Sequence, residues 1–408
     1  MTFFNVMTVD EASGEILKRF KEFQFKKEDV ALLDSLNRVL GEDIYSDIDV
    51  PEFDRSTVDG YAILSRDSYG ATDSIPTILD IVGEVLMGEE AQGEISSGQA
   101  MYVPTGGMIP EGADGMIMIE NTEKLDEETL LLNSPISKGE NLIYKGDDIG
   151  KGNLILEEGT RISPEVMGVL AALACKNVTV FKKPKFYIIS TGDEIIGIDE
   201  RLEFGKIRDI NSYTLFGEIE NLGGKVVGSS IIGDDFDLLK GETEKALKQA
   251  DIVLLSGGSS VGTLDFTKDV IDSFHGEGVF VHGISVKPGK PTIIGEAEGK
   301  LVFGLPGHPV SSIIVFKALV ERFAKEKIGV SEIPSQVEAV MDFNFPSTSG
   351  RLTYQMVNLE KREGEYFARP NFGKSSMISL LKESDGYILI GKHEEGIYKG
   401  ERRRVFLI

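Results

Sequence analysis

Between residues 185 and 328 this 408-residue chain alternates short apolar runs with amphipathic stretches, and that alternation constrains the fold more than any other feature. The apolar runs have the length of strands, and the stretches between them have helical spacing. The expected strands are 186–190, 225–232, 252–256, 279–285 and 301–304, and the expected helices are 212–222, 236–249, 266–274 and 311–325. Such alternation builds a mostly parallel sheet covered by helices on both faces. We therefore predict an α/β domain over residues 179–328.

Regions with other patterns of apolar and turn-forming residues flank this domain, so the chain is predicted to be a multidomain α/β and β protein. Short apolar runs broken by Gly and Pro indicate strands, and they occur in two separate regions. The predicted flanking domains are an inserted β-rich domain over 47–146, a split helical domain over 7–46 and 147–178, and a small β domain over 329–408.

The split domain is predicted to be helical because its two parts carry helix-start signals. Thr8 followed by Glu11 fits a capping box, so residues 8–40 are predicted to be helical, with a second helical stretch at 32–39. Ser163-Pro164 fits a capped helix start, which predicts another helix within 160–175.

Composition excludes several classes of protein. Acidic residues outnumber basic ones 67 to 43, and the net charge of −24 argues against broad nucleic-acid binding. The single cysteine, Cys175, excludes an intrachain disulfide and a cysteine-based zinc site, and we expect it to be a small buried hydrophobe. The N-terminus lacks signal-peptide features and no run approaches 18 apolar residues, so a cytoplasmic protein without a membrane span is expected.

The predicted sheet suggests where a ligand would bind. In an open α/β sheet, ligands bind beyond the carboxyl ends of the strands, and parallel strands bring those ends to one edge. Polar loops that contain Gly or acidic residues follow the expected strands, at 191–194, 233–235, 257–262, 287–291 and 305–311. We therefore expect these five loops to converge.

The loops contain groups that suit anions. Residues 257–260, Gly-Gly-Ser-Ser, can offer backbone N–H groups and hydroxyls to a phosphate. Lys287 and Lys290 flank Pro-Gly, and two ammonium groups held close together indicate an oxyanion between them. Ser311, with Gly307 allowing close approach, lies at a helix start that suits a small oxyanion.

Each of these features also has a plainer interpretation. The Gly-Gly-Ser-Ser segment is equally a flexible turn, the two lysines can be solvated, and Ser311 can be a helix cap. Acidic residues in the same loops would repel a phosphate unless a divalent cation such as Mg²⁺ intervened, although those that precede helices can be caps. The acidic residues are Asp193, Glu194, Asp234, Asp235 and Asp265, and of these Asp235 and Asp265 precede expected helices. The residues alone thus predict a nucleotide or phosphorylated ligand, a divalent metal and a second small oxyanion, without identifying the substrate.

The loops also form an ordered set of motifs that resembles the molybdopterin molybdenumtransferase family, whose eukaryotic relatives include the E domain of gephyrin. The matching motifs are PEFDRSTVDGYA at 51–62, PTGGMIPEGAD at 104–114, KGDD at 145–148, STGDE at 190–194, SGGSSVG at 256–262 with Asp265, KPGKP at 287–291 and GLPGHPVS at 304–311. The resemblance covers residues 8–380 and implies four domains, the last of them a β-barrel. It implies binding of adenylylated molybdopterin with Mg²⁺, entry of molybdate into the dithiolene, and release of AMP.

The resemblance assigns roles by position. Asp265, Glu194, Asp234, Lys287 and Lys290 are expected to be catalytic, with Asp265 and Glu194 holding Mg²⁺. Residues expected to contact the nucleotide, the pterin or the oxyanion are Thr191, Gly192, Asp193, Gly257, Gly258, Ser260, Gly262, Pro306, Gly307, Pro309, Ser311, Arg351 and Ser375. Asp59, Thr105 and Asp148 match positions that face the active site from the partner subunit, so a homodimer is implied, as is contact with a molybdopterin adenylyltransferase.

Three residues depart from the family pattern. His308 stands where Asn is usual, which changes the hydrogen bonding of its loop. Ile143 stands where Arg is frequent, so one anion contact is lost or shifted to Lys145. Val58 replaces a frequent Met, which we expect to be neutral.

Other functions fit parts of the sequence. The α/β domain alone resembles a molybdopterin adenylyltransferase, so a pyrophosphatase or adenylyltransferase acting on a related pterin nucleotide is the main rival. The two flanking β regions and the Asp59 motif argue against it. A gephyrin-like scaffold is disfavoured by the intact set of carboxylates and lysines. A tungstate-inserting homologue cannot be separated by loop sequence, because the two oxyanions have nearly the same size and charge.

Overall fold

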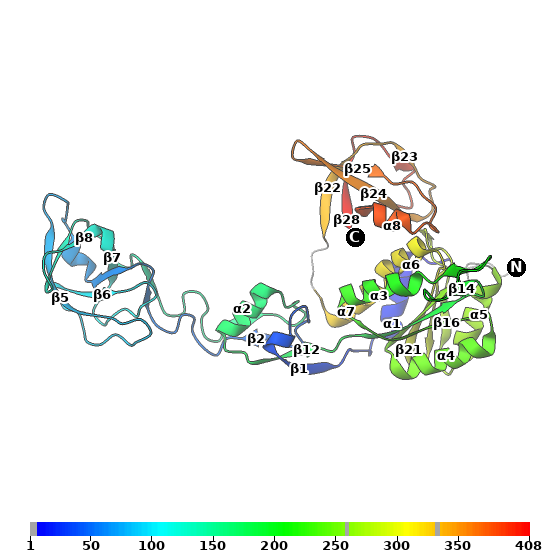
Figure 1. The fold of residues 1–408 in the computed structure, drawn as a ribbon, viewed down its shortest axis with the longest axis horizontal. Helices are drawn as coiled ribbons and strands as arrows, with labels where there is room; N and C mark the ends of the chain where they lie inside the picture. Colours follow the sequence, from blue (N-terminus) through cyan, green and yellow to red (C-terminus); the bar gives the residue numbers. More distant parts are fainter. Residues whose placement is uncertain (1–5, 258–260, 331–334) are drawn as a thin grey trace.

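The chain folds into four lobes arranged as an elongated molecule. A computed structural model describes residues 6–257, 261–330 and 335–408, with only the backbone described for 261–265. The α/β lobe lies at one end with the C-terminal lobe above it, and the inserted β lobe lies at the opposite end of the long axis (Figure 1). The split lobe connects these two ends.

The α/β lobe contains a six-stranded sheet in the order β16-β13-β17-β21-β20-β18. Its strands are β13 (Lys185–Thr191), β16 (Lys225–Ile232), β17 (Ile252–Gly257), β18 (Gly278–His282), β20 (Ile293–Ala297) and β21 (Lys300–Leu305). β16, β13, β17 and β21 are mutually parallel, as predicted. β20 was not predicted and runs antiparallel between β21 and β18, so the sheet is mixed at one edge.

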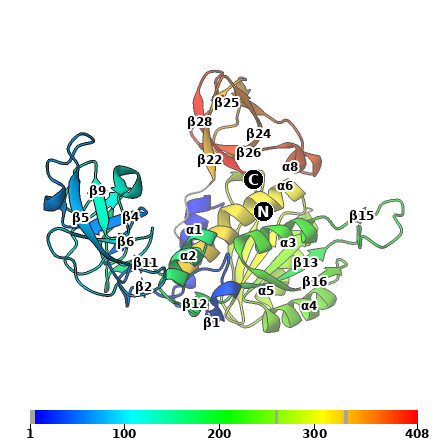
Figure 2. The same cartoon turned by 60° about the vertical axis from the view of Figure 1, so that its left-hand side comes forward.

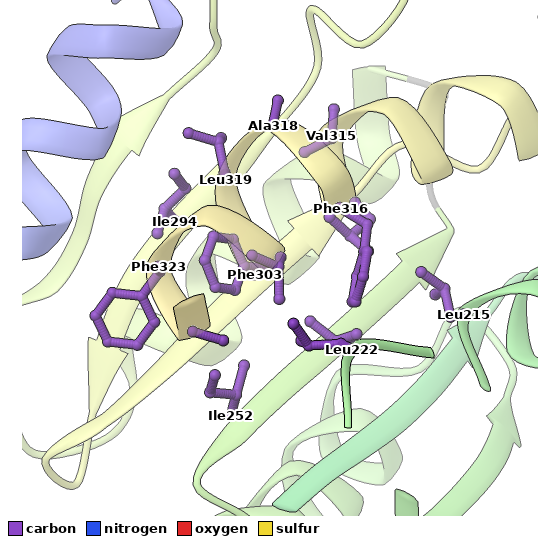
Figure 3. Packing of buried hydrophobic residues seen from close by; sticks show 14 of the residues in the cluster. Leu215, Leu222, Ile252, Ile294, Phe303, Val315, Phe316, Ala318, Leu319 and Phe323 are labelled. Carbon is purple, nitrogen blue, oxygen red and sulfur yellow. The ribbon is translucent and has the colours of Figure 1, made fainter. Parts of the chain in front are cut away.

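Helices cover both faces of this sheet. They are α3 (Asn211–Leu222), α4 (Phe236–Gln249), α5 (Val261–Asp272), α6 (Pro309–Val315) and α7 (Arg322–Ile328), with a π-helical segment at Phe316–Glu321. Alternate β13 residues face opposite ways, so Phe186 packs with α3, α6 and α7, while Tyr187 packs with α4 and α5. On the first face, Phe303 of β21 lies among Phe316 and Phe323 of the long helical segment (Figure 3).

The N-terminal segment differs from prediction after its first helix. α1 (Val9–Arg19) begins with the predicted capping box: the Glu11 amide donates to Thr8 Oγ1 at 3.2 Å, and the Thr8 amide donates to Glu11 Oε2 at 2.8 Å. The predicted helix over 8–40 is otherwise wrong. β1 (Lys27–Ala31) follows, and only a 3-10 turn, Leu32–Asp34, remains of the stretch 32–39. Tertiary pairing of β1 with β12 outweighs the local helical pattern.

The split lobe is therefore built mainly from strand pairs. β1 pairs with β12 (Asn177–Phe181), and β2 (Ile44–Tyr45) pairs with β11 (Leu154–Leu156). The α1 part of the predicted split domain packs instead in the core of the α/β lobe, through Val9, Ala12 and Ile16. The remaining α-helix of the split lobe, α2 (Pro164–Ala172), begins at the predicted cap, where the Val166 amide donates to Ser163 Oγ at 3.3 Å. Cys175 is half-buried beside this helix, and burial raises the pKa of its thiol.

The inserted lobe is β-rich, as predicted. It contains a six-stranded sheet in the order β7-β4-β6-β5-β9-β8 and a separate β3–β10 pair. The strands are β3 (Arg55–Ser56), β4 (Gly60–Ile63), β5 (Thr77–Glu84), β6 (Gln99–Val103), β7 (Gly115–Met118), β8 (Thr122–Lys124), β9 (Thr129–Leu132) and β10 (Leu142–Ile143). Tyr61, Ile63, Leu79 and Ile117 belong to its own apolar core.

The C-terminal lobe is a five-stranded barrel in the order β24-β25-β22-β28-β26, closed by pairing of β26 with β24. Its strands are β22 (Gln336–Met341), β24 (Leu352–Arg362), β25 (Glu365–Pro370), β26 (Gly386–Ile390) and β28 (Arg402–Leu407). β25 and α8 (Ser379–Glu383) were not predicted. β19 (Val286–Lys287) of the α/β lobe adds to β24, which joins the barrel to the sheet domain.

Two further features concern the surface. The short pair β14 (Ile195–Ile196) and β15 (Ile207–Arg208) carries a loop that stands away from the α/β lobe (Figure 2). Among the described residues, no helix is long and apolar enough to cross a membrane.

Candidate functional site

The parallel strands end level with one another, which brings their following loops together. In the sheet register Thr191 pairs with both Ile232 and Gly257, and Ser256 pairs with Leu305. The loops after β16, β13, β17 and β21 therefore start at the same edge of the sheet. This confirms for those four strands the convergence that the sequence predicted.

Two of these loops form an acidic cluster. The Asp234 amide donates to Asp193 Oδ1 at 3.0 Å, and Lys206 Nζ donates to the Asp193 carbonyl at 2.6 Å. Burial raises the pKa of the Asp234 carboxyl, and the negative charges of Asp193 and Glu194 raise it further. Such mutual repulsion is what a bound cation would relieve.

Close backbone approach at this edge requires glycine. Gly257 has φ +153°, and a Cβ there would lie 2.1 Å from the Thr191 carbonyl oxygen. Gly192 has φ +146°, and its Cβ would lie 2.6 Å from Glu194 Oε2. Any side chain at either position would push the neighbouring loop, or the Glu194 carboxylate, away from the edge.

Asn211, which was not predicted to be functional, ties two of the loops together. Its Nδ2 donates to Ser256 Oγ at 2.9 Å and to the Gly307 carbonyl at 2.8 Å. The side chain is buried, and among the described residues its Oδ1 has no hydrogen-bond partner. The only sequence signal was an Asn at the start of an expected helix, which by itself predicts nothing more than a cap.

The loop after β21 leads directly into α6. Because Pro309 takes the first helical position, the N-cap residue is His308, and the prediction that Ser311 caps this helix is wrong. Ser311 lies two residues inside α6 and is buried. His308 Nδ1 instead lies 2.9 Å from Ser375 Oγ of the C-terminal lobe.

The lysine loop is rigid, but its ammonium groups are exposed. Thr292 Oγ1 donates to the Gly289 carbonyl at 2.7 Å, and Gly289 has φ +125°, where a Cβ would lie 2.7 Å from Val315 Cγ2 of α6. Lys287 and Lys290 are both exposed, and neither forms an ion pair within the described residues. The loop therefore presents two uncompensated positive charges.

A cavity of about 320 Å³ lies between the α/β lobe and the barrel. Lys287 and Val310 line it from the α/β lobe, and Thr353, Gln355 and Ser375 line it from the C-terminal lobe. The structure thus places the predicted residues Lys287 and Ser375 on the same cavity. Arg351 is exposed and immediately precedes the β19–β24 pairing.

Part of the predicted nucleotide loop lies outside the described residues. Gly258 and Ser260 fall there, and for Gly262 and Asp265 only the backbone in α5 is described. That backbone corrects one expectation: α5 begins at Val261, so Asp265 is inside the helix and cannot be its N-cap. Asp235 is a true cap of α4, since its Oδ1 accepts the Leu238 amide at 2.9 Å. No cluster of three metal-binding side chains occurs among the described residues.

Of the three residues expected to act from the partner subunit, Asp59 and Thr105 belong to the inserted lobe, and Asp148 lies just beyond its predicted end. Asp59 Oδ1 accepts the Thr105 amide at 2.8 Å, so these two lie together. The Asp148 amide donates to the Val50 carbonyl at 3.1 Å. All three residues are exposed, and the lobe that contains Asp59 and Thr105 lies at the far end of the molecule from the α/β sheet (Figure 1).

The fold and the site define an α/β ligand-binding protein with a barrel over its sheet edge and a remote β lobe. Residues 7–174 match the family "MoeA N-terminal region (domain I and II)", residues 187–326 match "Probable molybdopterin binding domain", and residues 338–407 match "MoeA C-terminal region (domain IV)".

Full-length relatives give the same result. The chain is 32% identical to the molybdopterin molybdenumtransferase of Bacillus subtilis, with 98% of this chain and 94% of that protein covered. It is 31% identical to the enzyme of the same name from Haemophilus influenzae, with 97% of each covered. A crystal structure of a molybdopterin biosynthesis MoeA protein from Pyrococcus horikoshii OT3 superposes with a TM-score of 0.85, at 31% identity, covering 99% of this chain and 100% of that one. The chain belongs to the MoeA family.

Proposed function

We propose that this protein is a molybdopterin molybdenumtransferase, which inserts molybdate into adenylylated molybdopterin and releases AMP. The observation that carries the proposal is the combination of three features in the α/β lobe: level strand ends, neighbouring carboxylates in the loops that follow them, and Lys287, which lines a cavity and has no ion-pair partner among the described residues. Family membership supplies the identity of the substrate, because the relatives carry that enzyme's name.

The roles proposed for the individual residues follow from their charges and hydrogen bonds. Lys287 and Lys290 would attract molybdate, since their ammonium groups have no carboxylate to neutralise them among the described residues. Asn211 holds the Gly307 carbonyl, which fixes the loop that approaches the same cavity. Gly192 and Gly257 present backbone without a Cβ at this edge, which suits the phosphate groups of the nucleotide.

Mg²⁺ fits the acidic loops. Burial raises the pKa of Asp234, repulsion from Asp193 and Glu194 raises it further, and a divalent cation with phosphate oxygens would remove that repulsion. Glu194, together with Asp265 of α5, would hold the ion. Bound there, Mg²⁺ would neutralise charge that develops as the pyrophosphate bond breaks.

The site is proposed to be completed by a second copy of the chain. Asp59 and Thr105 are exposed, but the lobe that contains them lies at the far end of the molecule from the α/β lobe (Figure 1). In a homodimer this lobe can face the partner's edge, which gives the exposed side chains a role that one chain cannot provide. Contact with a molybdopterin adenylyltransferase and a cytoplasmic location remain predictions.

The test is AMP release from adenylylated molybdopterin by the purified protein. We expect release only when both molybdate and Mg²⁺ are present, and Asp265→Ala should bind the nucleotide but release little AMP. Release without molybdate would favour a pyrophosphatase, and no release would favour a scaffold. Full molybdate-dependent activity in Asp265→Ala would contradict the metal role. Competition by tungstate in the same assay measures which oxyanion is preferred.

A further inference from the structure

One residue of the barrel holds the loop at 304–311 through two bonds. Ser375 Oγ lies 2.9 Å from His308 Nδ1, and the Ser375 carbonyl accepts the Val310 amide at 3.1 Å. His308 is the N-cap residue of α6 but makes no capping bond with its side chain. Its ring is therefore used for the contact between lobes rather than for the helix.

The contact with Ser375 is separate from the hydrogen bond that holds the loop on the side of the sheet. There, Asn211 holds the Gly307 carbonyl and is itself held by Ser256 at the end of β17. Losing the His308 bond would leave that anchor intact. The His308–Ser375 bond therefore adds to the Val310–Ser375 bond in fixing where the Ser375 side chain lies, while the loop keeps its own anchor.

The barrel residue so fixed is part of the cavity wall. Ser375 and Lys287 both line the cavity of about 320 Å³, one from each lobe, together with Val310. The spacing between the two walls therefore depends on contacts that cross between the lobes. The His308–Ser375 bond is a side-chain contact of that kind at the start of α6.

The chemistry of the pair suits a fixed connection. A serine hydroxyl can donate to an unprotonated ring nitrogen or accept from a protonated one, so the bond can persist in either state. Asn carries its amide atoms at the δ position, as His carries Nδ1, so Asn at 308 can make the same bond. Ala cannot.

We propose that His308 is a positioning residue that holds Ser375 against the Lys287 side of the cavity and so sets the affinity for the oxyanion. The inference rests on the proposed function, since molybdate is the oxyanion that the test uses. His308 touches no reacting atom in this proposal, and its effect passes through Ser375.

The experiment compares His308→Ala and His308→Asn with the full-length wild type. In molybdate-dependent AMP release, His308→Ala should raise the KM for molybdate about 10-fold with little change in kcat, as expected when one hydrogen bond that supports binding is lost. His308→Asn should restore the wild-type KM. The Val310 amide, which donates to Ser375, should exchange hydrogen several-fold faster in His308→Ala, as measured by mass spectrometry on peptides covering 306–316.

Ser285→Ala is the matched control. Ser285 Oγ donates to the Gly350 carbonyl of the C-terminal lobe at 3.0 Å, so this substitution removes a different bond between the lobes. It should leave the KM for molybdate unchanged. An equal rise in KM for Ser285→Ala, an unchanged KM in His308→Ala, or a fall in kcat that His308→Asn does not restore would each overturn the inference. If the wild type itself releases no AMP with molybdate, the proposed function fails instead, and the exchange measurement still reports on the bond.

Discussion

The carboxyl edge of the α/β sheet and the inserted lobe both carry residues expected at the site, but they are built differently. At the sheet edge, backbones meet so closely that Gly257 admits no Cβ, and Asn211 is buried between two loops. In the inserted lobe, Asp59 and Thr105 are exposed and bond mainly to each other. The edge is organised within one chain, whereas the exposed side chains of the inserted lobe would meet such an edge only in the proposed homodimer.

The largest expected effect is on activity, when one of these two regions is damaged in each of two variants and the variants are then mixed. Asp59→Asn and Glu194→Gln should each lower molybdate-dependent AMP release by about 100-fold or more, since each removes a charged group from the proposed site. In a mixed population, half of the dimers would carry both variants, and each of these would have one intact site. Mixing should then restore about a quarter of wild-type activity.

The control for mixing is the pair Asp234→Asn and Glu194→Gln, in which both changes lie on the same side of the proposed interface. Every mixed dimer of that pair has two damaged sites, so activity should stay low. Equal recovery in both pairs, or none in either, would contradict an active site shared between subunits. The measurement requires subunit exchange, which co-expression with two affinity tags provides.

A smaller effect is expected from the lysine loop alone. Lys287→Ala should lower activity about 10- to 100-fold at low molybdate, because the cavity wall loses a positive charge that has no ion-pair partner among the described residues. Saturating molybdate should recover part of the loss. Lys138→Ala, an exposed lysine of the inserted lobe, is the matched control and should be neutral. An equal effect of the two would mean that net charge, rather than the cavity, governs the binding of molybdate.

The close packing of the edge predicts a loss of stability. Gly257→Ala should lower the free energy of unfolding of the α/β lobe by about 2 to 4 kcal/mol, because its Cβ would meet the Thr191 carbonyl oxygen at 2.1 Å. Gly241→Ala, in α4 with open space around it, should instead raise the free energy of unfolding by up to about 1 kcal/mol. Urea denaturation gives both values, and two changes of the same sign would contradict this account.

The sequence predicted the strands and helices that form the sheet edge better than it predicted the contacts between loops and lobes. β16 and α4 match the predicted ranges, because a strong apolar period and flanking turns set them locally. β1 was missed, because it depends on pairing with β12 about 150 residues away. The bond between His308 and Ser375 and the role of Asn211 depend on how lobes and loops meet in space, which spacing along the chain does not contain.

The smallest expected effect is on the melting temperature, and it should differ between two neighbouring aspartates of one loop, Asp234 and Asp235. The pKa of Asp234 is raised in the folded protein above its ordinary value of 3.8, so its charged form is disfavoured by folding. That penalty is present at neutral pH and disappears as the pH falls through the folded-state pKa towards 3.8, where the carboxyl is protonated. Asp234→Asn should therefore raise the melting temperature at pH 7 by about 1 to 3 °C, and the gain should shrink near pH 4.

Asp235→Asn is the control for this prediction, because Asn caps a helix as well as Asp does and the bond to the Leu238 amide is kept. It should leave the melting temperature nearly unchanged at both pH values. Mg²⁺ should stabilise the wild type more than Asp234→Asn, since only the wild type has the full repulsion for the ion to relieve. A wild type that gains nothing from Mg²⁺, or an Asp234→Asn variant that is less stable at pH 7, would show that these carboxylates form no cation site and that the sheet edge binds its ligand through the lysines and backbone alone.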